Sequence, residues 1–204
     1  MIGIVDYGLG NVQAIANIYR KLDMPCMPVR DSMSLRAANQ LILPGVGSFD
    51  WAMRRLQASG MREALDEAVL ERRTPVLGIC VGLQMMMRRS DEGSLPGLGW
   101  IAGEVRRFED VRLAAGRRLP HMGWNDVEPR AGVPIFRDLG RDVRFYFLHS
   151  YYVVTDGPDE VLATTDYGGP FTCSAGRSNI FGVQFHPEKS HRWGVQLLKN
   201  LATC

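Results

Sequence analysis

The chain has few cysteines, four among 204 residues: Cys26, Cys80, Cys173 and Cys204. They are scattered, and no CxxC pair occurs. This spacing excludes the disulfide framework of a small secreted domain and offers no structural zinc site. We therefore expect reduced thiols in a cytosolic protein that uses no metal and no cofactor.

The sequence also lacks long hydrophobic runs and an excess of charge of one sign. No stretch approaches the ~18 consecutive apolar residues of a membrane span, and the opening MIGIVDYG has neither the basic nor the long apolar segment of a signal peptide. Twenty-four basic against 22 acidic residues leave a net charge of +2, and no aromatic ladder accompanies the basic doublets. Neither a membrane nor a nucleic acid is a predicted partner, and a cytoplasmic location is expected.

What the first half contains is an alternation of short apolar runs with helical periodicity. Runs 2–5, 41–44 and 74–79 are continuous and bounded by Gly or Pro, which is typical of strands covered on both faces. Apolar residues recur at helical spacing in two segments between them, 12–19 and 49–56. This alternation predicts an α/β fold with an open, mostly parallel sheet and helices on both faces.

From about residue 96 the pattern changes to short strands and turns. Segments 144–154, 161–165 and 179–185 indicate antiparallel strands added at one side of the sheet. A last helix is expected after Ser190. No Ser- or Pro-rich linker and no repeat divides the chain, so the sequence predicts a single domain over 1–204.

A candidate nucleophile lies in GICVG at 78–82, where Cys80 stands between two glycines, after a strand and before an apolar helix. This is the cysteine form of the nucleophile elbow, a strained strand-to-helix turn that lifts the side chain clear of the sheet. A helix N-terminus favours thiolate, and the next backbone N–H can donate to an oxyanion. The alternative is an inert core cysteine, a common small hydrophobe.

The sequence offers a base for that thiol in FHPEKS, where His186 follows a strand and Glu188 comes two residues later. In an extended backbone these two side chains point the same way, so Glu188 can hold the imidazole while His186 faces the nucleophile. A solvated turn after the strand is the alternative. His149 competes as the base, but it lies in an apolar strand without such a carboxylate, which favours a pocket or core position.

Two glycine-rich segments can approach a ligand closely. PGVGSF at 44–49 follows a strand, and its backbone N–H groups can face the same pocket as GICVG, because ligands in open α/β sheets bind beyond the carboxyl ends of the strands. GLGN at 8–11 is a rival phosphate-binding loop. The dinucleotide pattern requires a third glycine where the chain has Gln13, which disfavours that use.

GICVGLQ and FHPE together resemble the class I (triad) glutamine amidotransferases. Within that class the chain is similar, over nearly its whole length, to the glutaminase subunits of imidazole glycerol phosphate synthases. The matching segments are DYGLGN at 6–11, LILPGVGSF at 41–49, GICVGLQ at 78–84, PHMGWN at 120–125, FLHSYY at 147–152 and FGVQFHPEKS at 181–190. Val81 and Leu83 depart from the Leu and Met expected in the elbow, but both preserve an apolar helix start.

The resemblance implies a mechanism. Cys80 would attack the glutamine side-chain amide, His186 would move the proton to the departing nitrogen, and Glu188 would fix the imidazole. A glutamyl thioester and ammonia result, and water then releases glutamate. The oxyanion would be held by the backbone N–H groups of Val81 and Val46.

The resemblance also implies a glutamine pocket. Glu92 is suited to the substrate α-ammonium, although SDEG also has the composition of an exposed turn. The residues expected to line the pocket are Gly45, Gly47, Gln84, Glu92, Ser150 and Tyr151.

A protein partner is implied as well, because ammonia in neutral water is mostly protonated and must reach its acceptor out of bulk solvent. The expected partner is a cyclase subunit of (β/α)8-barrel fold that forms imidazole glycerol phosphate, and the isolated chain is expected to have little glutaminase activity. Candidates for the docking face are Asn11, Trp124, Tyr146 and Lys189, which could also be independent surface positions.

Two alternatives remain at this point. The chain could be a glutaminase subunit that supplies a different synthase, such as one acting in nucleotide-sugar modification. It could also be a catalytically silent α/β scaffold that binds a partner. The identity of a copurified partner would distinguish the first alternative from an imidazole glycerol phosphate synthase subunit. Covalent labelling of Cys80 by an electrophilic glutamine analogue would distinguish an active glutaminase from a silent scaffold.

Overall fold

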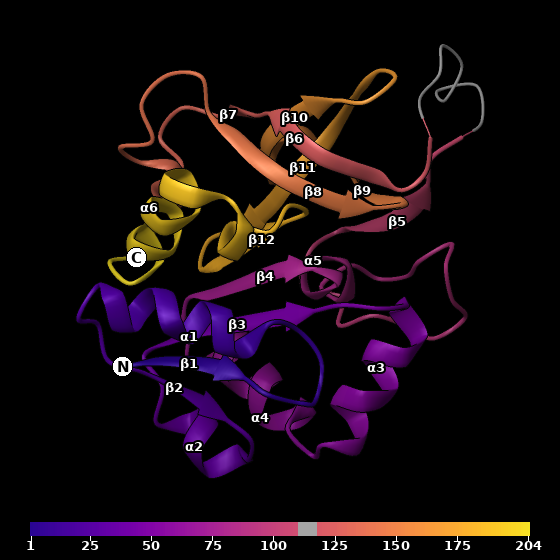
Figure 1. Cartoon of the computed structure of the whole chain (residues 1–204). Helices are drawn as coiled ribbons and strands as arrows, with labels where there is room; N and C mark the ends of the chain where they lie inside the picture. The colour runs from indigo at the N-terminus through magenta and orange to yellow at the C-terminus, as the bar shows by residue number, and fades with distance from the viewer. Residues whose placement is uncertain (110–117) are drawn as a thin grey trace.

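The computed structural model describes residues 1–109 and 118–204 of the chain. The first half alternates strands with helices, as predicted (Figure 1). Its elements are β1 (Ile2–Val5), α1 (Val12–Lys21), β2 (Cys26–Val29), α2 (Ser32–Arg36), β3 (Gln40–Gly45), α3 (Phe49–Ala58), α4 (Arg62–Asp66), the π-helical turn η1 (Glu67–Glu71), β4 (Val76–Cys80) and α5 (Val81–Met85).

The second half of the described chain is mostly β structure and ends in a helix. Its elements are β5 (Gly103–Arg107), β6 (His121–Asp126), β7 (Glu128–Pro129), η3 (Pro134–Phe136), β8 (Arg144–His149), β9 (Tyr151–Thr155), η4 (Pro158–Glu160), β10 (Val161–Asp166), β11 (Pro170–Arg177), β12 (Ile180–Val183), η5 (Pro187–Lys189) and α6 (His191–Leu201).

A parallel sheet with the order β2-β1-β3-β4-β12 forms the centre of the fold. Every residue of β1, β4 and β12 is buried, which explains why these strands read as continuous apolar runs. Helix α1 packs on α6, where the hydroxyl of Tyr19 donates to the carbonyl of Leu198 at 2.8 Å. The mostly parallel sheet with its packed helices confirms the predicted α/β class.

Antiparallel strands extend this sheet beyond β12, in the order β11-β10-β7, while β9 pairs with β11 and β5 pairs with β9. The prediction for 179–185 was wrong in one respect, because β12 pairs in parallel with β4. Segment 144–154 is two strands, separated at Ser150. The short edge strand β2 was not predicted, since its sequence, CMPV, contains Pro and no continuous apolar run.

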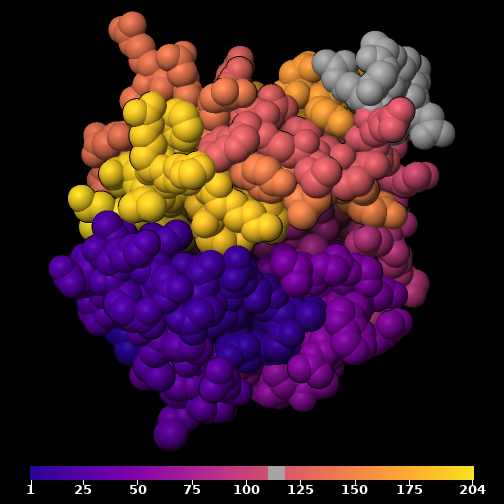
Figure 2. All heavy atoms as spheres, in the orientation of Figure 1, coloured from indigo at the N-terminus to yellow at the C-terminus, as the bar shows by residue number. Residues whose placement is uncertain are grey.

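Strands β6 and β8 form a separate two-stranded antiparallel ribbon. Met122 pairs with Leu148, and Trp124 pairs with Tyr146, so these four side chains lie on one face of the ribbon. Figure 2 shows the C-terminal residues, in yellow, resting directly on the N-terminal half, in indigo. Within the described ranges, no helix combines the length and apolar character needed to cross a bilayer.

Candidate active site

Strand β4 runs directly into helix α5 at Cys80, which has φ 55° and ψ −112°. Non-glycine residues rarely adopt a positive φ, so the backbone is strained at this position. The turn is also tightly packed. A side chain on Gly78 would meet the backbone of Gly82, and one on Gly82 would meet the carbonyl of Leu43. The structure therefore has the elbow geometry that GICVG predicted.

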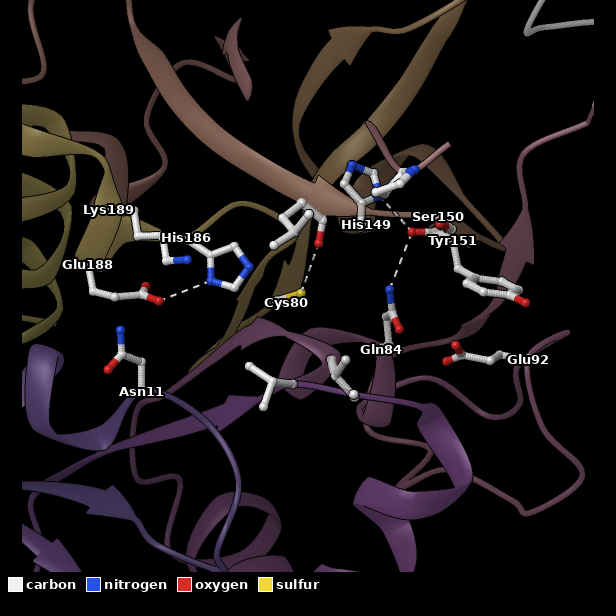
Figure 3. A pocket seen from close by; sticks show the side chains of 15 residues that line it. Asn11, Cys80, Gln84, Glu92, His149, Ser150, Tyr151, His186, Glu188 and Lys189 are labelled. Carbon is white, nitrogen blue, oxygen red and sulfur yellow. Dashed lines mark hydrogen bonds and ion pairs between the residues drawn. The ribbon is translucent and has the colours of Figure 1, made fainter. Parts of the chain in front are cut away.

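His186 stands between Cys80 and Glu188 (Figure 3). Its Nδ1 lies 3.0 Å from Glu188 Oε1, and the sulfur of Cys80 is close enough to its ring to raise the pKa of the imidazole. Because Nδ1 is engaged by the carboxylate, Nε2 is the nitrogen that faces the sulfur. The three residues meet because β12 lies beside β4 in parallel, so that both chain segments emerge at the same edge of the sheet.

Glu188 reaches His186 by a different route from the predicted one. Strand β12 ends at Val183, and Pro187–Lys189 form a 3-10 turn rather than extended chain. The carbonyl of His186 accepts from the hydroxyl of Ser190 at 2.6 Å, which closes this turn. The turn, not strand alternation, folds the carboxylate back onto the imidazole.

The electrostatic environment keeps a proton on His186. Burial by itself lowers its pKa, but the interactions of the ring with Cys80 and with the Glu188 carboxylate outweigh burial and raise the pKa to about 10. The side chains of His186 and Glu188 are both buried. An imidazolium in this state is an acid that can deliver its proton to a leaving group.

A cavity of about 350 Å³ opens above Cys80. Most of the predicted substrate and oxyanion residues line it, together with the predicted interface residues Asn11 and Lys189. Those in the lining are Val46, Gly47, Val81, Gln84, Glu92, Ser150 and Tyr151. Gly45 does not line it. A side chain there would collide with the backbone of Val81 and Gly82, so this glycine allows β3 to pack against the elbow.

Glu92 is hydrogen-bonded to the first residue of α3, the helix that follows the PGVG loop. Its Oε2 accepts from the backbone N–H of Phe49 at 2.8 Å. Burial raises the pKa of Glu92, the Phe49 N–H opposes that shift, and the negative charge of Asp50 adds to it. Asp50 in turn accepts from the backbone N–H groups of Ser94 and Leu95. The SDEG segment is therefore anchored to α3 rather than a free turn.

The predicted interface residues fall into two groups. Trp124 and Tyr146 lie on the outer face of the β6–β8 ribbon with ring centroids 6.2 Å apart, and Lys189 Nζ lies 5.8 Å from the Tyr146 ring centre. Asn11 lies across the cavity, before α1 (Figure 3). Met122 is 64% exposed and Leu148 37%, so this face is apolar and reaches the rim of the cavity, which Leu148 also lines.

Several residues near the nucleophile were not predicted from the sequence. Gln184 Nε2 lies 3.7 Å from Cys80 Sγ, and the Leu148 carbonyl accepts from the same sulfur at 3.9 Å. His121 contacts His149, at 2.9 Å between ring nitrogens, so in the described part of the chain the candidate base His149 is hydrogen-bonded to another imidazole and to no carboxylate. No local pattern marks these contacts. The polar Gln184 in the otherwise apolar FGVQF segment is the one available signal.

Comparison with known proteins agrees with this geometry. The family model of class I glutamine amidotransferases matches residues 3–203. The chain is 53% identical to imidazole glycerol phosphate synthase subunit HisH of Bdellovibrio bacteriovorus over 202 residues, covering 99% of both chains. It is 44% identical to the subunit of the same name from Leptospira borgpetersenii over 203 residues, covering 100% of both chains.

Solved structures share the fold at low sequence identity. A glutamine amidotransferase crystal structure superposes with a TM-score of 0.75 at 20% identity, covering 98% of both chains. The PurLQS structure from Thermotoga maritima gives 0.69 at 18% identity, covering 99% of this chain and 97% of the other. The chain therefore belongs to the class I glutamine amidotransferase family and, within it, to the group of imidazole glycerol phosphate synthase HisH subunits.

Proposed function

We propose that the chain is the glutaminase subunit of an imidazole glycerol phosphate synthase. It hydrolyses glutamine to glutamate and ammonia, and it delivers the ammonia to a cyclase subunit in histidine biosynthesis. The observation that carries this proposal is the buried line of contacts from Cys80 through His186 to Glu188, at the bottom of a cavity of amino-acid size. Residues 1–204 act as one catalytic unit in the cytoplasm.

In the proposed reaction, the proton of the Cys80 thiol is already on Nε2 of His186 when the sulfur attacks the side-chain amide carbon of glutamine. The same proton goes to the nitrogen as the C–N bond breaks, which releases ammonia and leaves a glutamyl thioester. A water then loses a proton to His186, attacks the thioester carbon, and releases glutamate and the thiol. Glu188 accepts from Nδ1 throughout and stabilises the imidazolium.

Two backbone donors are assigned to the oxyanion. The Val81 N–H is at the first position of α5, where helix geometry provides no intrahelical acceptor. The second donor is the N–H of Val46 in the PGVG loop, beside Gly47, whose φ is 85°. Loss of one such donor typically costs about 3 kcal/mol in the barrier, so the orientation of a single peptide in this loop controls the rate.

The remaining cavity residues are assigned to glutamine itself. The second oxygen of Glu92 receives the α-ammonium group, while Gly47, Gln84, Ser150 and Tyr151 form the walls. Gly45 acts by packing and not by contact.

The cyclase subunit, a (β/α)8 barrel, docks on the rim of the cavity. The exposed outer face of the β6–β8 ribbon supplies an apolar surface there, and Asn11 and Lys189 supply polar contacts on either side of the cavity opening. Covering the opening keeps ammonia away from bulk water. We expect little glutamine turnover by the lone chain and strong stimulation by the cyclase with its ligand, and full turnover without the partner would contradict this.

Labelling with a diazoketone analogue of glutamine, followed by peptide mass spectrometry, tests the catalytic proposal. The analogue is expected to modify Cys80 and to leave Cys204 unmodified, although Cys204 is exposed. Excess glutamine should protect Cys80. Preferential modification of Cys204, or none at all, would leave the silent scaffold as the better account. Copurification with a synthase other than a cyclase would favour the alternative pathway.

A further inference from the structure

A buried amide contacts the sulfur of the nucleophile. Gln184 has no exposed surface, and its Nε2 lies 3.7 Å from Cys80 Sγ, within hydrogen-bonding range for sulfur. Its backbone N–H donates to the carbonyl of Cys173 at 2.8 Å. Both the main chain and the side chain of Gln184 are therefore held in place.

The orientation of this amide follows from its neighbours. The carbonyl of Tyr151 can only accept, so the Gln84 atom 3.3 Å from it must be the amide nitrogen. The same nitrogen lies 3.1 Å from the side chain of Gln184, which must present its oxygen there. The Gln184 nitrogen is then the atom that faces Cys80. A flipped Gln184 amide would set two nitrogen donors against each other.

The same carbonyl also fixes two imidazoles. His149 Nδ1 lies 2.8 Å from the Tyr151 carbonyl and must carry the hydrogen, so its Nε2 accepts from Nδ1 of His121 at 2.9 Å. His121 Nε2 then accepts from Asn125 Nδ2 at 3.3 Å. Burial lowers the pKa of His149 to about 3 and that of His121 to about 4, so both rings remain neutral donors and acceptors near pH 7.

We propose that Gln184 is a positioning residue that donates its amide N–H to the Cys80 sulfur and keeps the thiolate aligned with His186. The Leu148 carbonyl can accept from a thiol, but it offers nothing to a thiolate. Gln184 still donates to the sulfur when the proton is on His186. The orientation of its amide is fixed by the hydrogen bonds that run from Gln184 through Gln84 to the Tyr151 carbonyl. This inference rests on the proposed glutaminase function, in which Cys80 is the nucleophile.

Alkylation of the full-length chain by iodoacetamide, measured at Cys80 as a function of pH, tests the proposal directly. Gln184→Met has nearly the same length but no donor. We expect its alkylation rate at pH 7 to fall about tenfold and the midpoint of its rate profile to move up by about one pH unit, the usual effect of losing a hydrogen bond to a charged group. Cys204 in the same sample provides the reference rate.

Two further variants separate this role from packing. Gln184→Leu has a branched end of similar size but neither donor nor acceptor in any protonation state, so it should show the same upward shift. Gln57→Met, on the exposed side of α3, should match the wild type. A wild-type profile in folded Gln184→Leu would overturn the proposal even if Gln184→Met failed to fold. If the diazoketone does not label the wild type, the proposed function fails, while the alkylation profile still reports on Gln184.

Discussion

The carboxylate of Glu92 accepts a 2.8 Å hydrogen bond from the backbone N–H of Phe49, the first residue of α3. Glu92 lines the cavity, and one of its carboxylate oxygens therefore caps α3, the helix that follows the PGVG loop. This hydrogen bond links the proposed site of the substrate ammonium to the helix that follows the proposed oxyanion loop.

Glu92→Gln should separate these two roles. The amide keeps an oxygen for the Phe49 N–H but loses the charge for the substrate, so we expect KM for glutamine to rise about tenfold or more with kcat little changed. Glu92→Ala loses the cap too and should also lower the free energy of unfolding by about 1 kcal/mol. Steady-state kinetics in complex with the cyclase measure the change in KM, and urea denaturation measures the change in stability.

Glu63→Gln, exposed on α4, is the matched control. An unchanged KM in Glu92→Gln would show that Glu92 does not bind the substrate.

Strain at the elbow predicts an unusual order of stability. Because Cys80 has φ 55°, the free energy of unfolding of Cys80→Gly should be about 1 kcal/mol higher than that of Cys80→Ala. The reverse order holds in an unstrained helix, so Ala52→Gly in α3 should lose about 1 kcal/mol. Urea denaturation of the three variants checks this. A less stable Cys80→Gly would show that the elbow stores no strain.

The buried imidazole pair predicts a loss of stability in mild acid. The pKa of His121 falls from its ordinary value near 6.5 to about 4 on folding, because burial disfavours the charged ring. The unfolded chain therefore binds a proton at a higher pH than the folded chain. This contribution to stability is complete above pH 6.5 and is lost as the pH falls towards 4.

Replacing the ring should remove that pH dependence. Between pH 6.5 and 4, His121→Gln is expected to reduce the slope of unfolding free energy against pH by up to about 1.4 kcal/mol per pH unit. Denaturation midpoints at several pH values, with wild type as reference, provide the measurement. Parallel curves for the two proteins would show that His121 is charged in the fold.

We expect the outer face of the β6–β8 ribbon to contribute most of the binding energy for the partner. Trp124 is a large, partly exposed aromatic in contact with Tyr146, the type of residue that dominates interface energies. Trp124→Ala should weaken binding of the cyclase subunit by about 2 kcal/mol, a rise in Kd of about 30-fold. Met33→Ala, at an 81% exposed position on α2, should leave calorimetric binding unchanged. Equal affinity of the two variants would place the interface elsewhere.

Several features of the site could be predicted because their signals are local. Cys80 is marked by its two neighbouring glycines, which only a tight strand-to-helix turn requires. His186 and Glu188 are marked by their closeness in the chain, although the turn that joins them was predicted as extended. Glu92 was suspected as a pocket residue from the resemblance, but its bond to Phe49 joins segments 43 residues apart and leaves no local pattern.

The sequence by itself determined the alternation of the central strands with helices in the first half, without β2 and α2. It also determined the elbow and the identity of the three proposed catalytic residues, because periodicity and glycine placement act over a few residues. Only the tertiary structure decided that β12 runs parallel beside β4, and this pairing is what brings His186 to Cys80. It also decided the hydrogen-bonded chain from Gln184 to His121. Such contacts depend on which buried donors and acceptors find each other after the chain has folded, and burial forces them to pair.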